Sequence, residues 1–177
     1  MPLTSDKAVL HAAIGPDSPE SSRTLKADGS TAGHLGLAWG WYMISPNFAY
    51  LWPTASRPKA YGSDNLIKAV IFMTDGEFNQ EYCTGVVDST INCDAPGNSQ
   101  AQAETLCTNI QASANKTYLY VVGFDLGGNA AALDFLDKCA TDDAPGETYF
   151  FQADNGADLN AAFNKIAQSL SDLRISK

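Results

Sequence analysis

The stretch KAVIFMTDGEF, residues 68–78, decides the fold class of this chain. Residues 69–73 are apolar in unbroken order, which is typical of a strand inside a parallel sheet. The run ends directly on Thr74, Asp75 and Gly76. Ligands of parallel sheets bind at the carboxyl ends of the strands, and a glycine there permits a tight turn. The sequence therefore places Asp75 at the edge of the sheet where binding is expected.

After residue 67 the sequence alternates between strand and helix patterns. Strands are predicted at 68–74, 117–124 and 148–152, and helices at about 100–114, 129–140 and 157–172. This order predicts an α/β fold, a Rossmann-like parallel sheet with right-handed crossovers and helices on both faces. Asp125 and Asp154 follow the second and third strands, as Asp75 follows the first.

The first third of the chain lacks a convincing strand. It offers a short helix at 4–14, capped by Thr4 or Ser5, a helix at 32–44 and an aromatic loop at 46–65. The helix at 32–44 is apolar almost all round, which predicts that it is well buried. Sheets usually have five or six strands, so three are few. We expect one domain over residues 1–177 whose first strands are missing. The unpaired edge of the strand at 68–74 would then favour dimerisation.

Composition limits the classes of partner. The chain has 177 residues, which suits one domain, and 45% hydrophobic with 18% charged residues is typical of a globular protein. A net charge of −9 disfavours nucleic acid and anionic membranes. No apolar run reaches the roughly 20 residues of a membrane span, and the start lacks the apolar region of a signal peptide. The chain is therefore either cytoplasmic or a piece of a longer exported protein.

The four cysteines favour export. Cys83, Cys93, Cys107 and Cys139 form no CxxC pair, and both histidines are far away, which disfavours a zinc site. An even count in a polar setting suggests two disulfides and an oxidising compartment. Cys83 and Cys93 bracket a short loop and pair most naturally, which leaves Cys107 and Cys139 on successive helices. Four cysteines allow three pairings, and four reduced buried thiols are the alternative.

The residues around Asp75 could bind a hard cation. Mg²⁺ is held by carboxylates, hydroxyl and carbonyl oxygens and water. Ser30 and Thr31, just ahead of the helix at 32–44, are a second source of oxygen, and Glu77 is a candidate outer-shell acid. Asp75 could instead position a water molecule or cap the next turn.

Several motifs carry a family resemblance over nearly the whole chain. KAVIFMTDGE resembles the third metal-site motif of von Willebrand factor type A domains, and GST before a helix resembles the second. The ordered set LTSDKAVLHAAI, DGSTAGHLGLAWGWYMISP, KAVIFMTDGEFN, YVVGFDLG and LNAAFNKIAQSLSDLRISK is similar to the C-terminal region of TadG-like proteins. These Flp or tight-adherence pilus-assembly proteins are anchored in the bacterial inner membrane, with a von Willebrand-type domain outside.

The resemblance implies a metal-ion-dependent adhesion site that is incomplete. Thr31 matches the family's loop threonine and Asp75 the acid of its Thr-Asp-Gly. The family's Asp-x-Ser-x-Ser is missing, since Ala32 stands where Asp28-Gly29-Ser30 would need the second serine. The resemblance therefore implies that this chain begins after the first strands and binds Mg²⁺ or another divalent cation weakly or not at all.

Two classes of function follow. The resemblance implies a non-enzymatic adhesion module, in the periplasm or on the cell surface, that binds a pilus or envelope protein. Its metal site is either used or vestigial. The alternative is a metal-dependent hydrolase with Asp75 as nucleophile or metal ligand. The sequence contains no GxSxG, P-loop or HExxH motif that would support hydrolysis.

Overall fold

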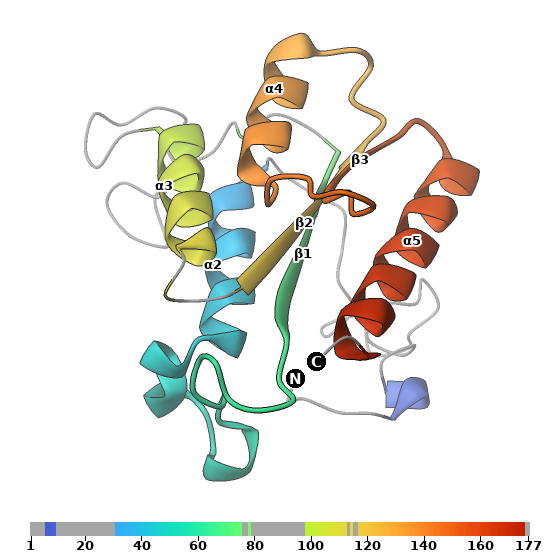
Figure 1. The fold of residues 1–177 in the computed structure, drawn as a ribbon. Helices are drawn as coiled ribbons and strands as arrows, with labels where there is room; N and C mark the ends of the chain where they lie inside the picture. The colour runs from blue at the N-terminus through green and yellow to red at the C-terminus, as the bar shows by residue number, and fades with distance from the viewer. Residues whose placement is uncertain are drawn as a thin grey trace. The chain divides into compact units, whose positions relative to one another are not determined.

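The structure is a computed structural model that describes residues 6–9, 31–75, 78, 98–112, 114 and 117–175 (Figure 1). The chain divides into two compact units, residues 1–30 and 31–177.

In the first unit, residues 7–9 are helical. Asp6 Oδ1 accepts hydrogen bonds from the backbone nitrogens of Ala8 and Val9, at 2.8 and 3.4 Å. Asp6 therefore caps this turn. The predicted caps, Thr4 and Ser5, lie outside the described residues.

The second unit has the predicted α/β order. Its elements are α2 (Gly33–Ile44), the 3-10 helices η1 (Pro46–Leu51) and η2 (Thr54–Ser56), β1 (Lys68–Thr74), α3 (Ser99–Gln111), β2 (Thr117–Phe124), α4 (Ala130–Cys139), β3 (Phe150–Ala153) and α5 (Gly156–Ile175). The strands form one sheet in the order β1-β2-β3, and both strand pairs are parallel. The Rossmann-like arrangement is thus confirmed.

Helices cover both faces of the sheet. Val70 pairs with Leu119 and Ile71 with Tyr120, so these two pairs point to opposite faces. On the first face, a Cβ built on Gly40 of α2 would lie 3.4 Å from Val70 Cγ1. On the second, Tyr120 shares a hydrogen bond of 2.8 Å with Ser169 of α5. Figure 1 shows α2, α3 and α4 on one side of the strands and α5 on the other.

The core is centred on β2. Four consecutive β2 residues have no exposed surface, namely Leu119, Tyr120, Val121 and Val122. In β1, by contrast, Ile71 and Met73 are each 42% exposed. Within the part of the chain that the structure describes, β1 is an edge strand of the sheet, and one of its faces is exposed. The unbroken apolar run of β1 predicts burial on both faces, but only one face is buried.

The prediction that α2 is well buried is wrong for half of the helix. Leu37 and Ala38 are buried against the core, but Trp39 is 57% exposed. An apolar helix is usually covered, but its sequence does not say whether its own chain or another molecule covers it.

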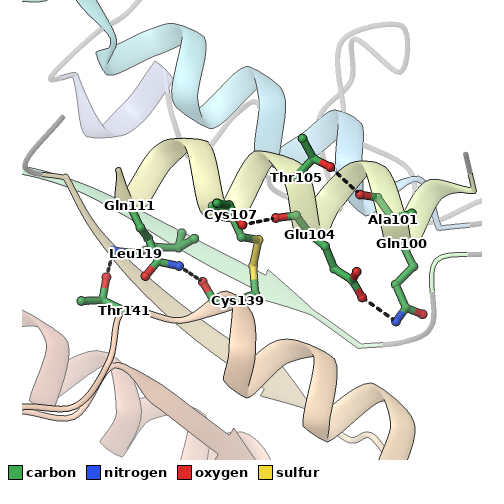
Figure 2. Close-up of a disulfide and its surroundings, with 10 residues drawn as sticks. Gln100, Ala101, Glu104, Thr105, Cys107, Gln111, Leu119, Cys139 and Thr141 are labelled. Carbon is green, nitrogen blue, oxygen red and sulfur yellow. Dashed lines mark hydrogen bonds between the residues drawn. A yellow bond between two sulfur atoms is a disulfide. The ribbon is translucent and has the colours of Figure 1, made fainter. Parts of the chain in front are cut away.

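A disulfide joins α3 to α4, as predicted. Cys107 and Cys139 are bonded with their Cα atoms 5.2 Å apart, and both are 2% exposed (Figure 2). Gln111 Nε2 donates to the carbonyl of Cys139 at 2.7 Å. Thr141, two residues after Cys139, joins the end of α4 to β2, since its Oγ1 accepts a hydrogen bond from Leu119 N at 2.8 Å. Cys83 and Cys93 lie outside the described residues, so their pairing stays a prediction.

A buried lysine ties the start of β1 to the end of α2. Lys68 Nζ donates to the carbonyl oxygen of Ile44, the last residue of α2, and lies 5.3 Å from the ring centre of Tyr61. Both contacts favour a cation, since helix carboxyl ends carry partial negative charge and aromatic faces attract ammonium groups. Burial nevertheless lowers the pKa of Lys68. The contact fixes the C-terminal end of α2 at the amino end of β1.

Candidate functional site at the carboxyl edge of the sheet

Helix α2 brings Thr31 to the end of the sheet where Asp75 lies. Its last residue, Ile44, contacts the start of β1, and its first residue, Gly33, lies against Phe78, which follows β1. The helix therefore runs antiparallel to the strand. Thr31, two residues before α2, lies at the carboxyl end of β1 with Asp75. Thr31 is half-buried and Asp75 is exposed. The two residues predicted as ligands thus come from distant segments to the same edge.

Phe78 holds this corner together. The centre of its ring lies 5.9 Å from the ring centre of Phe72 in β1 and 5.3 Å from that of Phe135 in α4, edge-on in both cases. Edge-to-face pairs contribute about 0.5–1.5 kcal/mol beyond their buried area. Gly33 approaches so closely that a Cβ there would lie 2.0 Å from Phe78 Cε1. Glycine is required at this position because the ring occupies the space of a side chain.

Gly33→Ala is expected to lower the free energy of unfolding by about 1–3 kcal/mol, since the new methyl group overpacks a held ring. The matched control is Gly36→Ala in the same helix, where nothing lies within 4 Å of an added Cβ. That substitution should be neutral or stabilise by up to about 1 kcal/mol through helix propensity. Urea unfolding followed by circular dichroism measures both. Equal effects of the two substitutions would contradict the close contact.

Each strand of the sheet is followed by an exposed carboxylate, as predicted. Asp125 follows β2 in the left-handed region with φ 50°, and its backbone nitrogen donates to the carbonyl of Ala153 at 2.9 Å. Asp154 follows β3 and accepts from Gln152 Nε2 at 3.1 Å. With Asp75, these acids give the carboxyl edge a negative character, which attracts cations rather than anionic ligands.

Two of the four predicted oxygen donors at this edge, Thr31 and Asp75, lie within the described residues. Within the described ranges, no group of three or more histidine, cysteine, aspartate or glutamate side chains could hold an ion. The other two predicted oxygen donors, Ser30 and Glu77, lie outside those ranges. Mg²⁺ needs near-octahedral oxygen coordination and commonly combines one or two carboxylates with water and ligand oxygens. Thr31 and Asp75 would leave most positions to water or to a partner protein.

A concave region, which the sequence did not reveal, lies at the amino ends of the strands, opposite the edge that carries Asp75. It is a cavity of ≈ 740 Å³ at the amino ends of β1 and β2. Its lining is mostly polar and includes Asp64, Asn65, Lys68, Gln111 and Asp142. Asn65 adopts the left-handed region there, with φ 57°. The residues come from two loops, the end of α3 and the first residues of β1 and β2, so no short motif marks the cavity. It is separate from the edge that carries Asp75.

No helix among the described residues has the length and apolar character to cross a membrane.

The Thr-Asp-Gly turn predicts the position of Asp75. The contact between Gly33 and Phe78 has no sequence signal beyond a glycine at the start of a helix. Comparisons with protein-family models, curated proteins and solved structures gave no match for this chain.

Proposed function

We propose that the chain is a non-enzymatic protein-binding module of the von Willebrand factor type A kind, from a TadG-like pilus-assembly protein. It acts outside the bacterial cytoplasm and binds a pilus or envelope protein. The observation that carries this proposal is that α2 and β1 bring Thr31 and Asp75, which match two of the family's metal-site positions, to one edge of the sheet. The ordered sequence motifs support the same family.

The arrangement suits binding better than bond chemistry. An exposed carboxylate and a hydroxyl at the same end of the strands can supply part of the coordination of a divalent cation, and an acidic side chain from a partner can supply another part. Hydrolysis would also need a general acid or base positioned within hydrogen-bond reach of the substrate. The sequence contains no GxSxG, P-loop or HExxH motif. Asp75 therefore acts by holding a partner, directly or through a cation.

Affinity capture from a bacterial envelope extract tests the binding role. The immobilised chain should retain a protein that Asp75→Ala loses. The matched control, Asp154→Ala, removes the same charge at the end of β3 and should retain it. Captures with Mg²⁺ and with EDTA separate metal-dependent from metal-independent binding. Retention by both variants alike would place the partner away from Asp75.

A hydrolase assay tests the alternative. With Mg²⁺ or Mn²⁺ present, the chain should turn over nitrophenyl phosphate and nitrophenyl acetate no faster than buffer, and Asp75→Ala should not change the rates. Turnover by the parent chain that Asp75→Ala abolishes would sink the non-enzymatic proposal in favour of the hydrolase.

A further inference from the structure

The outward side of α2 carries large apolar residues in water. Leu35, Trp39 and Met43, each four residues from the next, are 38%, 57% and 40% exposed. Residues four apart lie on one face of a helix, so they form a continuous stripe. Gly36 lies on the same face, and a Cβ built there would meet nothing within 4 Å. These four residues, Leu35, Gly36, Trp39 and Met43, are called the α2 stripe.

The helix η1 follows α2 in the chain, packs against it and stiffens it. Tyr50 and Leu51 of η1 are 74% and 45% exposed. The ring centre of Phe48 in η1 lies 4.2 Å from that of Tyr42. The ring centres of Tyr42 and Trp39 are 5.7 Å apart. Trp52 Nε1 also donates to the carbonyl of Tyr42 at 2.8 Å. This packing orders the surface before any partner arrives, which reduces the entropy lost on binding.

The surface is uncharged although the chain is acidic. Neither α2, GHLGLAWGWYMI, nor η1, PNFAYL, contains an aspartate, glutamate, lysine or arginine. The whole chain has a net charge of −9, so two copies repel each other in most orientations. Contact through the α2 stripe brings no like charges together. An apolar partner surface is required, because a charged one would lose its hydration without finding an ion pair.

We propose that the α2 stripe is the contact surface between two copies of this chain, with α2 crossing its symmetry mate. A two-fold contact is self-complementary, so Trp39 of each copy can lie over Gly36 of the other. The open space at Gly36 lets the two helices approach closely, and Leu35 and Met43 flank the crossing. The stripe therefore contains both the protruding side chain, Trp39, and the open position, Gly36, that a symmetric contact needs.

The exposed area of the stripe is smaller than that of a standard interface. At about 150–250 Å² per aromatic side chain, the exposed 57% of Trp39 amounts to roughly 130 Å². That is about a sixth of the ~800 Å² that each partner buries in a standard interface, before Leu35 and Met43 are counted. The contact is therefore expected to be reversible and concentration-dependent. It uses none of the residues at the carboxyl edge and does not depend on the proposed function.

Sedimentation equilibrium over a micromolar to millimolar range tests the proposal. The parent chain should show a monomer–dimer equilibrium. Gly36→Gln and Trp39→Ala should each raise the dissociation constant at least about tenfold. The control Phe163→Ala removes another exposed aromatic side chain, 38% exposed, from α5 on the other face of the sheet and should leave dimerisation unchanged. Circular dichroism and urea midpoints establish that Gly36→Gln remains folded, so that loss of the dimer is not loss of the fold.

Three results would overturn the proposal. The first is a parent chain that stays monomeric at millimolar concentration. The second is a dimer that Gly36→Gln and Trp39→Ala leave intact, since the contact would then lie elsewhere, for example at the edge of β1. The third is a monomer that co-floats with neutral phosphatidylcholine vesicles and loses this behaviour in Trp39→Ala, because the stripe would then face lipid.

Discussion

Replacing Cys107 and Cys139 together with serine is expected to lower the free energy of unfolding by about 3–4 kcal/mol. The bond closes a loop of 32 residues between α3 and α4 (Figure 2). Without it the unfolded chain regains the freedom of that loop, and two buried sites receive hydroxyl groups in place of sulfur. A loss of this size is a large part of the 5–15 kcal/mol that stabilises most domains.

Urea unfolding of the double variant under oxidising conditions measures this loss. Gln111→Ala is the matched control, because it removes only the hydrogen bond to the Cys139 carbonyl and should cost about 1 kcal/mol. The two results separate the covalent link from the contact beside it. A double variant no less stable than Gln111→Ala would show that the disulfide contributes little.

Raising the pH from about 10 to about 12 is expected to remove at most about 2 kcal/mol of stability through Tyr149. Burial raises the pKa of Tyr149 to about 12, from an ordinary value of 10.0, and nearby Tyr120 and Tyr118 add to the rise. The folded state thus favours the neutral phenol. This stabilisation is complete below pH 10 and is lost as the pH rises through the folded pKa. Tyr120, whose pKa burial also raises, acts in the same direction.

Urea midpoints at several alkaline pH values test this dependence. Tyr149→Phe should flatten the fall, because phenylalanine keeps the ring that stacks 5.7 Å from Tyr118 but cannot ionise. Lys68 acts oppositely, since its lowered pKa makes stability rise with pH, but only up to its ordinary value of 10.5. It does not account for a fall above that value. A flat profile for the parent chain would contradict the burial of Tyr149.

Much of the fold followed from local patterns. Strands β1 and β2 have the predicted bounds, because unbroken apolar runs end abruptly at polar or turn residues. Strand β3 begins two residues late, since Tyr149 N donates to Asp143 Oδ1 rather than to the sheet. Helix α3 ends at Gln111, three residues early, where Ala112 turns to φ −46° and ψ 130° although its sequence still favours helix. Patterns predict elements well and their ends less well.

The contacts that build the candidate site are harder to predict. Gly33 and Phe78 lie 45 positions apart by their residue numbers, and no periodicity links them. The exposure of Trp39 likewise depends on which elements cover α2, and an apolar helix sequence is the same in either case. The position of Asp75 could be predicted because it follows from the topology of parallel sheets alone.

We propose that the edge at Asp75 carries only part of a metal-ion-dependent adhesion site. Calorimetric titration of the chain with Mg²⁺, and separately with Mn²⁺, tests it directly. We expect no saturable binding tighter than millimolar, and the same weak heats for the parent chain and for Asp75→Ala. Micromolar affinity in the parent chain that Asp75→Ala abolishes would contradict it and would show that this chain completes the site by itself.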